Sequence, residues 1–346
     1  MPSSERVVTQ PAPGLPSRAR AALDRMIAVK PLRFSAYTVF GAVVVALPFI
    51  LGSNYLIRVA VMAGIYIMLS LGLNIVVGYC GLLDLGYVAF YAVGAYTYAF
   101  FASPHFGLHW PWLAVLPFAI IFPAMFGVAL GTPVLRLKGD YLAIVTLGFG
   151  EIIRIFINNL DNVTNGPKGI ANIDPISLFG FHFSTPTRYF YLVLFFVVLF
   201  VIIIGRLSNS RVGRAWAAIR EDEDAAKAMG LNTHSLKLRA FAMGASFAGI
   251  AGCLFAGFQT FVSPESFTFG ESVIIFCMIT LGGMGSIPGA ILGSIVLVVL
   301  PEILRPVADY RMLFYGLLLI LVMTMRPQGL WPSKQRKREL LERGGA

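Results

Sequence analysis

The chain has 346 residues, of which 57% are apolar and 13% are charged, and its mean hydropathy is +0.77. Soluble domains are ~45–50% apolar and ~25% charged. This composition excludes a soluble enzyme, a disordered chain and a disulfide scaffold, and it predicts an all-α polytopic membrane protein. The net charge of +10 does not indicate a nucleic-acid partner, because the basic residues cluster at the two ends and in one central loop.

The N-terminal tail, residues 1–33, is basic and polar. It is not a secretory signal, because its polar lead is too long and no small-residue cleavage site follows the first apolar run. Apolar residues from Leu15 to Ile27 fall on one helical face, which is typical of a helix lying on the inner surface of a membrane. A frayed tail is the alternative.

Apolar windows follow along the chain, and a helix needs ~20 such residues to cross the hydrocarbon core. We expect a transmembrane domain over 34–325 with eight to ten helices. The short window at 272–285 ends in Gly282-Gly283-Met284-Gly285, so it is a full span, a broken helix or a re-entrant segment. The ten windows are 34–51, 57–77, 82–102, 111–135, 141–158, 189–205, 241–262, 272–285, 287–304 and 312–325.

The distribution of Lys and Arg orients these helices. With the N-terminus inside, 21 of the 27 basic residues fall on the inner side, five on the outer side and one, Arg154, within a span. Inner loops of membrane proteins carry an excess of Lys and Arg. We therefore expect both termini in the cytoplasm and an even number of spans. The outer loop would be 159–188, the inner loop 206–240 and the basic inner tail 326–346.

Residues for catalysis or metal binding are not apparent. No Gly-Lys dipeptide occurs, so the chain cannot form the phosphate-binding loop of an ATPase. His105 and His109 are four residues apart in a short loop bracketed by prolines, which favours a solvated loop over a metal site. Cys80, Cys253 and Cys277 lie in or beside apolar runs and are expected to be small core residues. We expect neither an enzyme nor a metal centre.

Few charged residues lie within the spans, where each costs ~3 kcal/mol or more at mid-membrane. Asp84 opens the third window, and Glu151 and Arg154 are i, i+3 neighbours in the fifth. Two interpretations of this pair stay open: a self-neutralising pair that faces the helix bundle, or a polar lining of a translocation path. A transporter driven by an ion gradient would more often carry several unpaired carboxylates across its spans.

Small residues recur every four positions in the seventh window, and a second pair repeats the spacing. Such stripes let helix backbones approach closely. Packing inside one subunit and a contact between subunits are both compatible with them. The positions are Gly244, Ala248, Gly252 and Ala256, followed by Gly289 and Gly293.

The inner loop at 206–240 is the most informative stretch. Its four consecutive acidic residues, 221–224, can open a helix, because a helix N-terminus favours negative charge. Gly230 can end the helix from the position just after the last turn. The sequence therefore predicts a short helix over 221–230 that acts as a docking knob, with a solvated charged loop as the alternative. The small or soft residues expected on its surface are Ala225, Ala226 and Met229.

Asp224-Ala225-Ala226, followed by Gly230, resembles the E-A-A-x-x-x-G loop of ABC importer membrane subunits. In that family the loop forms the coupling helix, which sits in a cleft of a cytoplasmic ATPase. The wider family pattern continues with I-x-L-P, whereas this chain has Ala240-Phe241-Ala242. That departure is characteristic of one branch of the family.

Six further stretches are similar to that branch, the LivM-type permeases of branched-chain amino acid ABC importers. They occur in the same order as in the family, and the resemblance covers residues 60–332 of this chain. The stretches are Gly78–Gly86 with Gly94-Ala95-Tyr96, Gly166–Ile170, Gly213–Trp216, Phe261–Ser266, Leu281–Ser286 and Arg326–Leu330.

The resemblance implies a complex in the bacterial inner membrane. This chain would pair with a shorter related permease, two cytoplasmic ATPases and a periplasmic binding protein. It would supply half of the translocation pathway and one coupling helix. The substrates of the family are Leu, Ile, Val and related amino acids, and close relatives carry urea or short amides. ATP and magnesium would bind the ATPases, so no cofactor is expected in this chain.

Two sets of residues are candidates for these roles. The residues expected to contact the ATPase are Glu221, Glu223, Asp224, Ala225, Ala226, Met229 and Gly230. The residues expected to line the path are Asn74, Asp84, Tyr87, Glu151, Arg154, Gly282, Gly283 and Gly285. The three glycines either expose backbone groups to substrate at a broken helix or serve plain close packing. The alternative functions are a permease for urea, short amides, sugars or another small polar solute, and a stand-alone secondary transporter or channel.

Overall fold

The computed structural model describes residues 45–50, 52–135, 137, 139–178, 181–303, 316, 320, 324 and 329–331. The tail at 1–33, most of the predicted spans 34–51 and 312–325, and most of the tail at 326–346 lie outside the described residues. The chain divides into two compact units, residues 1–52 and 53–346. Residues 45–50 of the first unit are helical, and all elements from Asn54 onward belong to the second unit.

The second unit is built mainly of helices, which confirms the predicted all-α class. Its described strands have two residues each and lie in the connections between helices. In chain order the elements are α3 (Asn54–Leu73), η1 (Asn74–Tyr79, π-helical), α4 (Val88–Phe101), α5 (Trp112–Val134), α6 (Asp140–Asn159), α7 (Asp161–Thr164), η2 (Gly166–Lys168), β1 (Ile170–Ala171), β2 (Ser177–Leu178), β3 (Phe181–His182), α8 (Pro186–Ser208), α9 (Arg211–Glu221), α10 (Glu223–Ala228), α11 (Thr233–Gln259), β4 (Phe261–Val262), η3 (Pro264–Phe267), α12 (Phe269–Gly282) and α13 (Ile287–Ile303).

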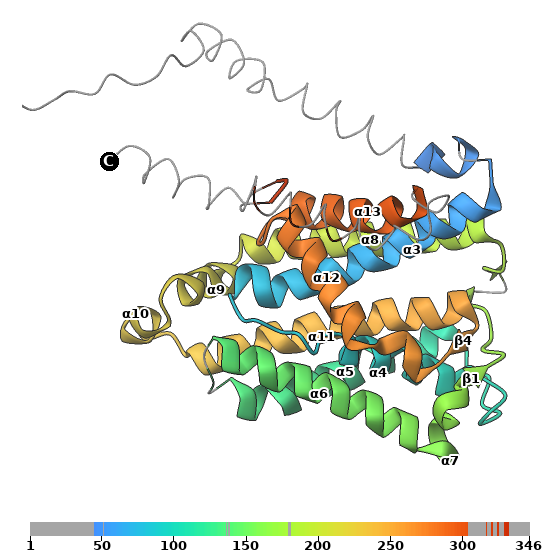
Figure 1. Cartoon of the computed structure of the whole chain (residues 1–346), viewed down its shortest axis with the longest axis horizontal. Helices are drawn as coiled ribbons and strands as arrows, with labels where there is room; N and C mark the ends of the chain where they lie inside the picture. Colours follow the sequence, from blue (N-terminus) through green and yellow to red (C-terminus); the bar gives the residue numbers. More distant parts are fainter. Residues whose placement is uncertain are drawn as a thin grey trace, which may run out of the picture. The chain divides into compact units, whose positions relative to one another are not determined.

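Helix α11 lies at the centre of this unit, between two groups of helices (Figure 1). It packs against α3 on one side and against α4 and α5 on the other. Helices α8, α12 and α13 pack with α3, while α6 packs with α4 and α5. Most of α11 beyond its first turns is buried, which explains why its residues there are small or apolar all round rather than on one stripe.

The small-residue stripe of α11 serves packing within the chain. All four of its residues, including Gly244 and Gly252, are buried. A Cβ at Gly252 would overlap the carbonyl oxygen of Tyr91 in α4, and one at Gly244 would lie 2.7 Å from a methyl carbon of Val76. Gly293 meets α12 in the same way, because its Cβ would overlap the carbonyl oxygen of Met278. Of the two interpretations of these stripes, the structure supports close helix crossings inside one subunit.

Four described helical segments are long and apolar enough to cross a membrane. Three shorter apolar helices accompany them. These observations support a polytopic membrane protein, while the total of eight to ten spans remains a prediction. The long segments are Asn54–Tyr79, Trp112–Val134, Pro186–Ser208 and Thr233–Gln259, and the short ones are Val88–Phe101, Phe269–Gly282 and Ile287–Glu302.

The third predicted window, 82–102, is wrong at its start. Helix α4 begins only at Val88, and residues 80–87 form a non-helical segment between η1 and α4. Gly81 has a φ of 76°, which a helix cannot contain. The side chain of Asp84 supplies a further reason, because its Oδ1 accepts a hydrogen bond from the backbone N–H of Gly86 at 3.0 Å and holds a turn there.

The window at 272–285 is a helix that ends early. Helix α12 has 14 residues and stops at Gly282. At 1.5 Å per residue it is about 21 Å long, which is shorter than the ~30 Å hydrocarbon core. Gly283 and Gly285 have φ values of 120° and 78°, which favour glycine and turn the chain into α13. The length of α12 disfavours a full span, and the broken helix and the re-entrant segment both stay predictions.

The predicted outer loop at 159–188 contains ordered elements. The turn signal Asn165-Gly166-Pro167 is confirmed, since Asn165 has a left-handed φ of 61° and η2 follows. Strand β1 pairs antiparallel with β4, with Ile170 opposite Val262. Two stretches that carried the family resemblance therefore meet here, and they tie this loop to the end of α11.

The cysteines lie where their surroundings in the sequence predict. Cys80 and Cys253 are buried, and Cys277 is partly buried. All three are free thiols.

Candidate functional site

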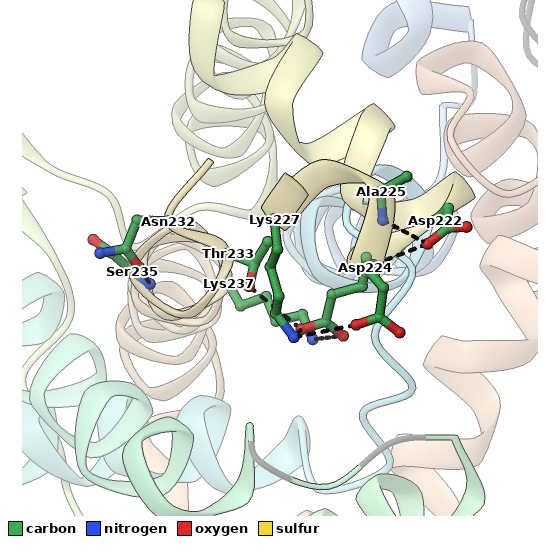
Figure 2. A network of polar contacts seen from close by, with 9 residues as sticks. Asp222, Asp224, Ala225, Lys227, Asn232, Thr233, Ser235 and Lys237 are labelled. Carbon is green, nitrogen blue, oxygen red and sulfur yellow. Dashed lines mark hydrogen bonds and ion pairs between the residues drawn. The ribbon is translucent and has the colours of Figure 1, made fainter. Parts of the chain in front are cut away.

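The loop predicted to carry the docking helix folds as a helical hairpin made of α9, α10 and the start of α11. A side chain caps the N-terminus of each helix, as Figure 2 shows for the last two. Ser210 accepts a hydrogen bond from the Gly213 N–H at 3.2 Å, and Asn232 accepts one from the Ser235 N–H at 3.1 Å. Such caps satisfy N–H groups that have no partner inside the helix, so this hairpin is specified locally by its sequence.

The acidic run does not open a single helix over 221–230. Glu221 ends α9, and Asp222 forms the junction in an extended conformation with φ −153° and ψ 111°. Its Oδ1 accepts hydrogen bonds from the N–H groups of Asp224 and Ala225, both at 2.9 Å. The predicted helix is thus corrected to α10, residues 223–228, because an extended capping residue cannot also be part of the helix.

Gly230 ends α10 as predicted. Its φ is 83°, and its N–H donates to the carbonyl of Lys227 at 2.9 Å. The N–H of Leu231 donates to the carbonyl of Ala226 at 3.1 Å. Backbone closure of this kind requires a left-handed residue after the last turn, which glycine adopts without steric cost.

An ion network joins α10 to the first turns of α11. Glu223 lies 2.6 Å from the ammonium of Lys237 and 3.1 Å from that of Lys227. Thr233 donates a hydrogen bond to the same carboxylate at 3.4 Å. The side chain of Lys237 is only 4% exposed, so its contact with Glu223 is a buried ion pair. The side chain of Lys227 is 48% exposed, so its contact with Glu223 is solvated.

The charge of Glu223 is set by opposing causes. Partial burial acts to raise the pKa of its carboxyl, but hydrogen bonds and attraction from Lys237 and Lys227 outweigh it and hold that pKa below its ordinary value. The hydrogen bond to Glu223 is the main reason that the pKa of Lys227 is raised. Both groups are therefore charged near neutral pH, and the network is complete under those conditions.

The exposed tip of the hairpin differs from the prediction in one residue. Ala226 is buried, with 4% exposure, and so does not form part of the surface. Met229 is 84% exposed, and Ala225, Asp224 and Gly230 are exposed beside it. Ala226 points inward because it lies one turn before Gly230, on the side where the chain folds back toward α11.

Arg220, the penultimate residue of α9, links the hairpin to η1 and the non-helical residues 80–87 that follow it. These residues form the first helix break. Its Nη1 donates a hydrogen bond to the carbonyl of Gly78 at 2.5 Å. Gly81 leaves room for this side chain, because a Cβ there would lie 2.7 Å from the Arg220 Cγ. One turn before Arg220, Trp216 is buried and its Nε1 donates to the carbonyl of Leu236 at 2.8 Å. A direct contact therefore joins the hairpin to the end of the α3–η1 segment.

The turn at Gly283–Gly285 between α12 and α13, the second helix break, lies against the same residues. The side-chain oxygen of Asn74 accepts a hydrogen bond from the Gly285 N–H at 2.9 Å. A Cβ on Gly78 would lie 2.6 Å from the Gly285 nitrogen, and a Cβ on Gly285 would lie 3.1 Å from Arg220 Nη1. Hairpin, π-helical turn and Gly283–Gly285 turn thus converge on Arg220 and Asn74, and a shift of one displaces the others.

The candidate path residues do not form one cluster. Asp84 is fully buried, and its Oδ2 has no hydrogen-bond partner among the described residues. The Tyr87 hydroxyl donates to the carbonyl of Gly244 at 3.0 Å. Gly282 is packed against α13, because its Cβ would overlap the carbonyl of Gly289, which supports the close-packing interpretation at that position.

Glu151 and Arg154 form the ion pair that their spacing predicts. Oε2 of Glu151 accepts from both Nε and Nη2 of Arg154, at 2.9 and 2.8 Å. The two side chains are half-buried, 30% and 35% exposed, at the boundary between the buried and the exposed faces of α6, and the two interpretations of the pair both stay predictions. The inner face of α6 instead carries Thr146 and Gly150, which pack on the Asp84 segment.

A pocket of about 220 Å³ separates the hairpin from the first helix break and from the start of α6. Its walls combine polar groups of the hairpin with the non-helical segment after η1. The lining residues are Cys80, Gly81, Leu82, Leu83, Leu137, Gly139, Leu142, Ile219, Arg220, Glu223, Asp224 and Lys237.

Sequence reasoning missed three residues of this site: Arg220, Asp222 and Lys237. Asp222 could have been found, because it lies just before the Asp224-Ala225-Ala226 motif and Asp is a preferred residue at the N-cap of a helix. Arg220 and Lys237 carry no such local signal. Their partners, Gly78 and Glu223, lie 142 and 14 positions away in the chain.

Replacing Asp222 with alanine is expected to destabilise α10 by about 1 kcal/mol, because two N–H groups lose their cap. Amide hydrogen exchange at 224–226 should become faster by a corresponding factor. Asp222→Asn keeps a capping oxygen and should exchange like the wild type. Equal acceleration in both variants would mean that the charge of Asp222, and not its capping oxygen, stabilises the helix.

Comparison with known proteins places the fold and the hairpin in a family. The sequence model described as "Branched-chain amino acid transport system / permease component" matches residues 55–323. The chain belongs to this permease family. The resemblance seen in the sequence alone is thereby confirmed.

Individual relatives agree with this assignment. The permease is 47% identical over 321 residues to the high-affinity branched-chain amino acid transport system permease protein LivM of Salmonella typhimurium, covering 86% of this chain and 75% of that one. Identity to LivM of Escherichia coli is also 47%, over 319 residues that cover 86% and 74%. LivH of Salmonella typhimurium is 27% identical over 281 residues, covering 77% of this chain and 90% of LivH. No significant match was found among solved structures.

Proposed function

We propose that this permease is one of two membrane subunits of an ATP-driven importer for branched-chain amino acids, and that the α9–α10 hairpin couples it to a cytoplasmic ATPase. The observation that carries the proposal is the bridge made by Arg220. The hairpin has an exposed apolar tip at Met229, and through Arg220 it is bonded to the carbonyl of Gly78 at the first helix break. A push on the tip therefore acts on the membrane-embedded helices.

The mechanism follows from this linkage. When ATP closes the two ATPases, the docked hairpin moves with them and carries Arg220. The contacts Arg220–Gly78 and Asn74–Gly285 join that movement to η1 and to the turn before α13. An ATPase can bias the permease only through contacts that differ between its two states, and these two hydrogen bonds are candidates for such contacts. Access would then alternate between the two sides of the membrane.

The proposal defines the arrangement of the complex. The loop 206–240 and both termini lie in the cytoplasm, and the chain sits in the bacterial inner membrane. A shorter permease related to LivH supplies the other half of the path, two ATPases bind ATP and magnesium, and a periplasmic protein delivers the amino acid. This chain then contains no cofactor of its own. Of the candidate path residues, Asn74, Asp84 and Tyr87 lie at or beside the first helix break and are the ones that its movement would shift.

Reconstitution tests the function directly. The full complex in proteoliposomes should accumulate leucine when ATP and the binding protein are present, and ATP hydrolysis should rise with leucine. Uptake by the chain alone, driven by a sodium or proton gradient, would contradict the proposal in favour of a secondary transporter. ATP-driven uptake of urea, acetamide or a sugar without leucine uptake would retain the importer and overturn its substrate.

Replacement of Met229 tests the docking tip. Met229→Glu should weaken co-purification of the ATPases at least about tenfold, equivalent to about 1.4 kcal/mol, because a charge replaces an apolar side chain that is 84% exposed. The permease itself should keep its yield and thermal stability, since no packing is lost. Arg211→Glu, an equally drastic change at the exposed start of α9, is the matched control and should retain the ATPases. Retention in both variants would exclude the tip as the docking surface.

A further inference from the structure

The pocket between the hairpin, the first helix break and the start of α6 has the size of a site for one small molecule. Its volume of about 220 Å³ is below the ~300–1,000 Å³ of pockets that hold drug-sized ligands. Its walls come from three parts of the chain that are far apart in the sequence: residues 80–83, 137–142 and 219–237. A molecule bound there would contact all three parts.

The hairpin supplies the charged wall of this pocket. Arg220 and Lys237 contribute positive charge, and Glu223 and Asp224 contribute negative charge. Figure 2 shows the side chains of Asp224 and Lys237 pointing toward one another. The side chain of Asp224 is 73% exposed, so the pocket is open to water on that side. The described lining carries two charges of each sign, which suits a ligand that has both signs and no net charge.

Lys237 is the buried member of this wall, and it has hydrogen-bonding capacity left. Its side chain is 4% exposed, and among the described residues its Nζ bonds one acceptor, Oε2 of Glu223, at 2.6 Å. An ammonium has three N–H donors. The backbone N–H groups of Gly81 and Leu83, which also line the pocket, donate to no described group. Because buried donors without a partner are costly, this part of the pocket has a place for an acceptor such as a carboxylate.

The apolar wall comes mainly from the other two parts of the chain. Leu82 and Leu83 belong to the first helix break, and Leu137 and Leu142 lie at the start of α6. Ile219 of α9 adds one apolar residue from the hairpin. An aliphatic group placed against this wall would be removed from water, which is favourable.

Three classes of small ligand can be compared with these walls. An inorganic anion would use the donors of Lys237, but it would be repelled by Glu223 and Asp224 and would leave the leucines in contact with water. An aliphatic amine would use Asp224 and the apolar wall, but it would leave the donors of Lys237 unpaired. An amino acid with an aliphatic side chain satisfies all three features, because it carries a carboxylate, an ammonium and an apolar group on one carbon atom.

We infer that this pocket binds a zwitterionic amino acid with an aliphatic side chain. Its α-carboxylate accepts from Lys237, its α-ammonium donates to Asp224, and its side chain packs on the leucines of the apolar wall. The chemistry of the ligand follows from the lining alone. The side of the membrane rests on the proposed function, because the pocket opens to the cytoplasm only if the loop 206–240 lies there. On that side the pocket is exposed to the amino acid that the importer has delivered.

Calorimetric titration of the full-chain permease in detergent tests the ligand class without ATPases or a binding protein. The ligands are leucine, 4-methyl-2-oxopentanoate, which lacks the ammonium, and 3-methylbutylamine, which lacks the carboxylate. We expect leucine to bind at least about tenfold more tightly than either of the others, because each of them loses one charge-assisted contact. Absence of leucine binding, or equal affinity for leucine and the oxo acid, would overturn the inference.

Photolabelling locates the site. A leucine analogue that carries a diazirine in its side chain should label the apolar wall, at Leu82, Leu137 or Leu142, when the permease is illuminated and analysed by peptide mass spectrometry. An excess of leucine should suppress the labelling. Labels that lie only in other parts of the chain, or that leucine does not suppress, would count against this pocket.

A substitution of Asp224 separates the two ends of the ligand. Asp224→Asn removes the partner of the ammonium, so leucine should bind at least about tenfold more weakly while the affinity for 4-methyl-2-oxopentanoate stays the same. Asp161→Asn is the matched control, because it makes the same change at an exposed carboxylate of α7 that does not line the pocket. Unchanged leucine affinity in Asp224→Asn, or equal loss in both variants, would contradict the assigned pose.

These outcomes are distinguishable from those that test the proposed function. If the complex imports leucine with ATP but the permease binds no leucine in this pocket, only the inference is overturned. If leucine binds and labels the pocket but the complex imports no leucine, the proposed function fails, and the assignment of the pocket to the cytoplasmic side fails with it.

Discussion

Replacing Gly94 with alanine is expected to destabilise the isolated permease by about 3 kcal/mol, the upper part of the range for overpacked cores. The three atoms nearest to a Cβ at Gly94 all belong to the backbone of Gly249 in α11, and all lie closer than 3.0 Å. A side chain could rotate away, but a backbone in a buried helix cannot. The two helices must therefore separate, which disrupts the central contact of the unit. The midpoint of thermal unfolding in detergent and the yield of monodisperse protein measure the effect.

Gly148→Ala is the matched control for this prediction. Gly148 is also helical, but nothing lies within 4 Å of the position of its Cβ. Alanine has the higher helix propensity, so this change should be neutral or stabilising by up to about 1 kcal/mol. If Gly94→Ala also proved neutral, α4 and α11 would have to lie farther apart than the structure places them.

Replacing Glu223 with glutamine is expected to cost the hairpin about 3 kcal/mol, because it leaves the ammonium of Lys237 buried without a counter-charge. Hydrogen exchange across 223–231 should accelerate, and leucine-stimulated ATP hydrolysis by the complex should fall. Asp224→Asn is the control for hydrogen exchange only, since the contact of Asp224 with Lys227 is longer, at 3.5 Å, and solvated. Exposed pairs of this kind contribute about 0–1 kcal/mol. Equal effects of the two substitutions would mean that the buried Glu223–Lys237 pair stabilises the hairpin no more than the exposed Asp224–Lys227 pair does.

The contribution of Glu223 should also depend on pH. Its ordinary pKa is 4.5, and its pKa in the folded protein is lower because of Lys237 and Lys227. The ion pair therefore stabilises the fold fully above about pH 4.5 and is lost as the pH falls through the lower, folded value. The difference in stability between the wild type and Glu223→Gln should be constant near neutral pH and should shrink in acid. A difference that grew on acidification would contradict a lowered pKa.

The sequence alone was sufficient for features that depend on neighbouring residues. Composition and apolar windows predict the all-α membrane class, because hydrophobic helices follow from local hydropathy. Gly230 predicts the end of α10, since its role depends on its own φ. The i, i+3 spacing predicts the Glu151–Arg154 pair. The ordered motifs along the chain pointed to the permease family that the comparison then assigned.

Predictions failed where the environment of a residue is set by distant parts of the chain. Ala226 was expected on the surface because it belongs to a small-residue motif, but the fold of the hairpin toward α11 buries it. The window 82–102 is apolar enough for one helix, yet its first residues are held in a turn by Asp84 and pack against Thr146 of α6. Apolarity identifies a segment that avoids water, and it does not specify where the helix starts.

Tertiary structure alone decided how the candidate site is connected. The bond from Arg220 to Gly78 and the bond from Asn74 to Gly285 join residues 142 and 211 positions apart. No periodicity or cap encodes such pairs, because they form only when two helix breaks and the end of α9 reach the same point. Likewise, the i, i+3 spacing determines that Glu151 and Arg154 pair, but only the packing of α6 on α4 and α5 determines that the pair is half-buried beside that contact.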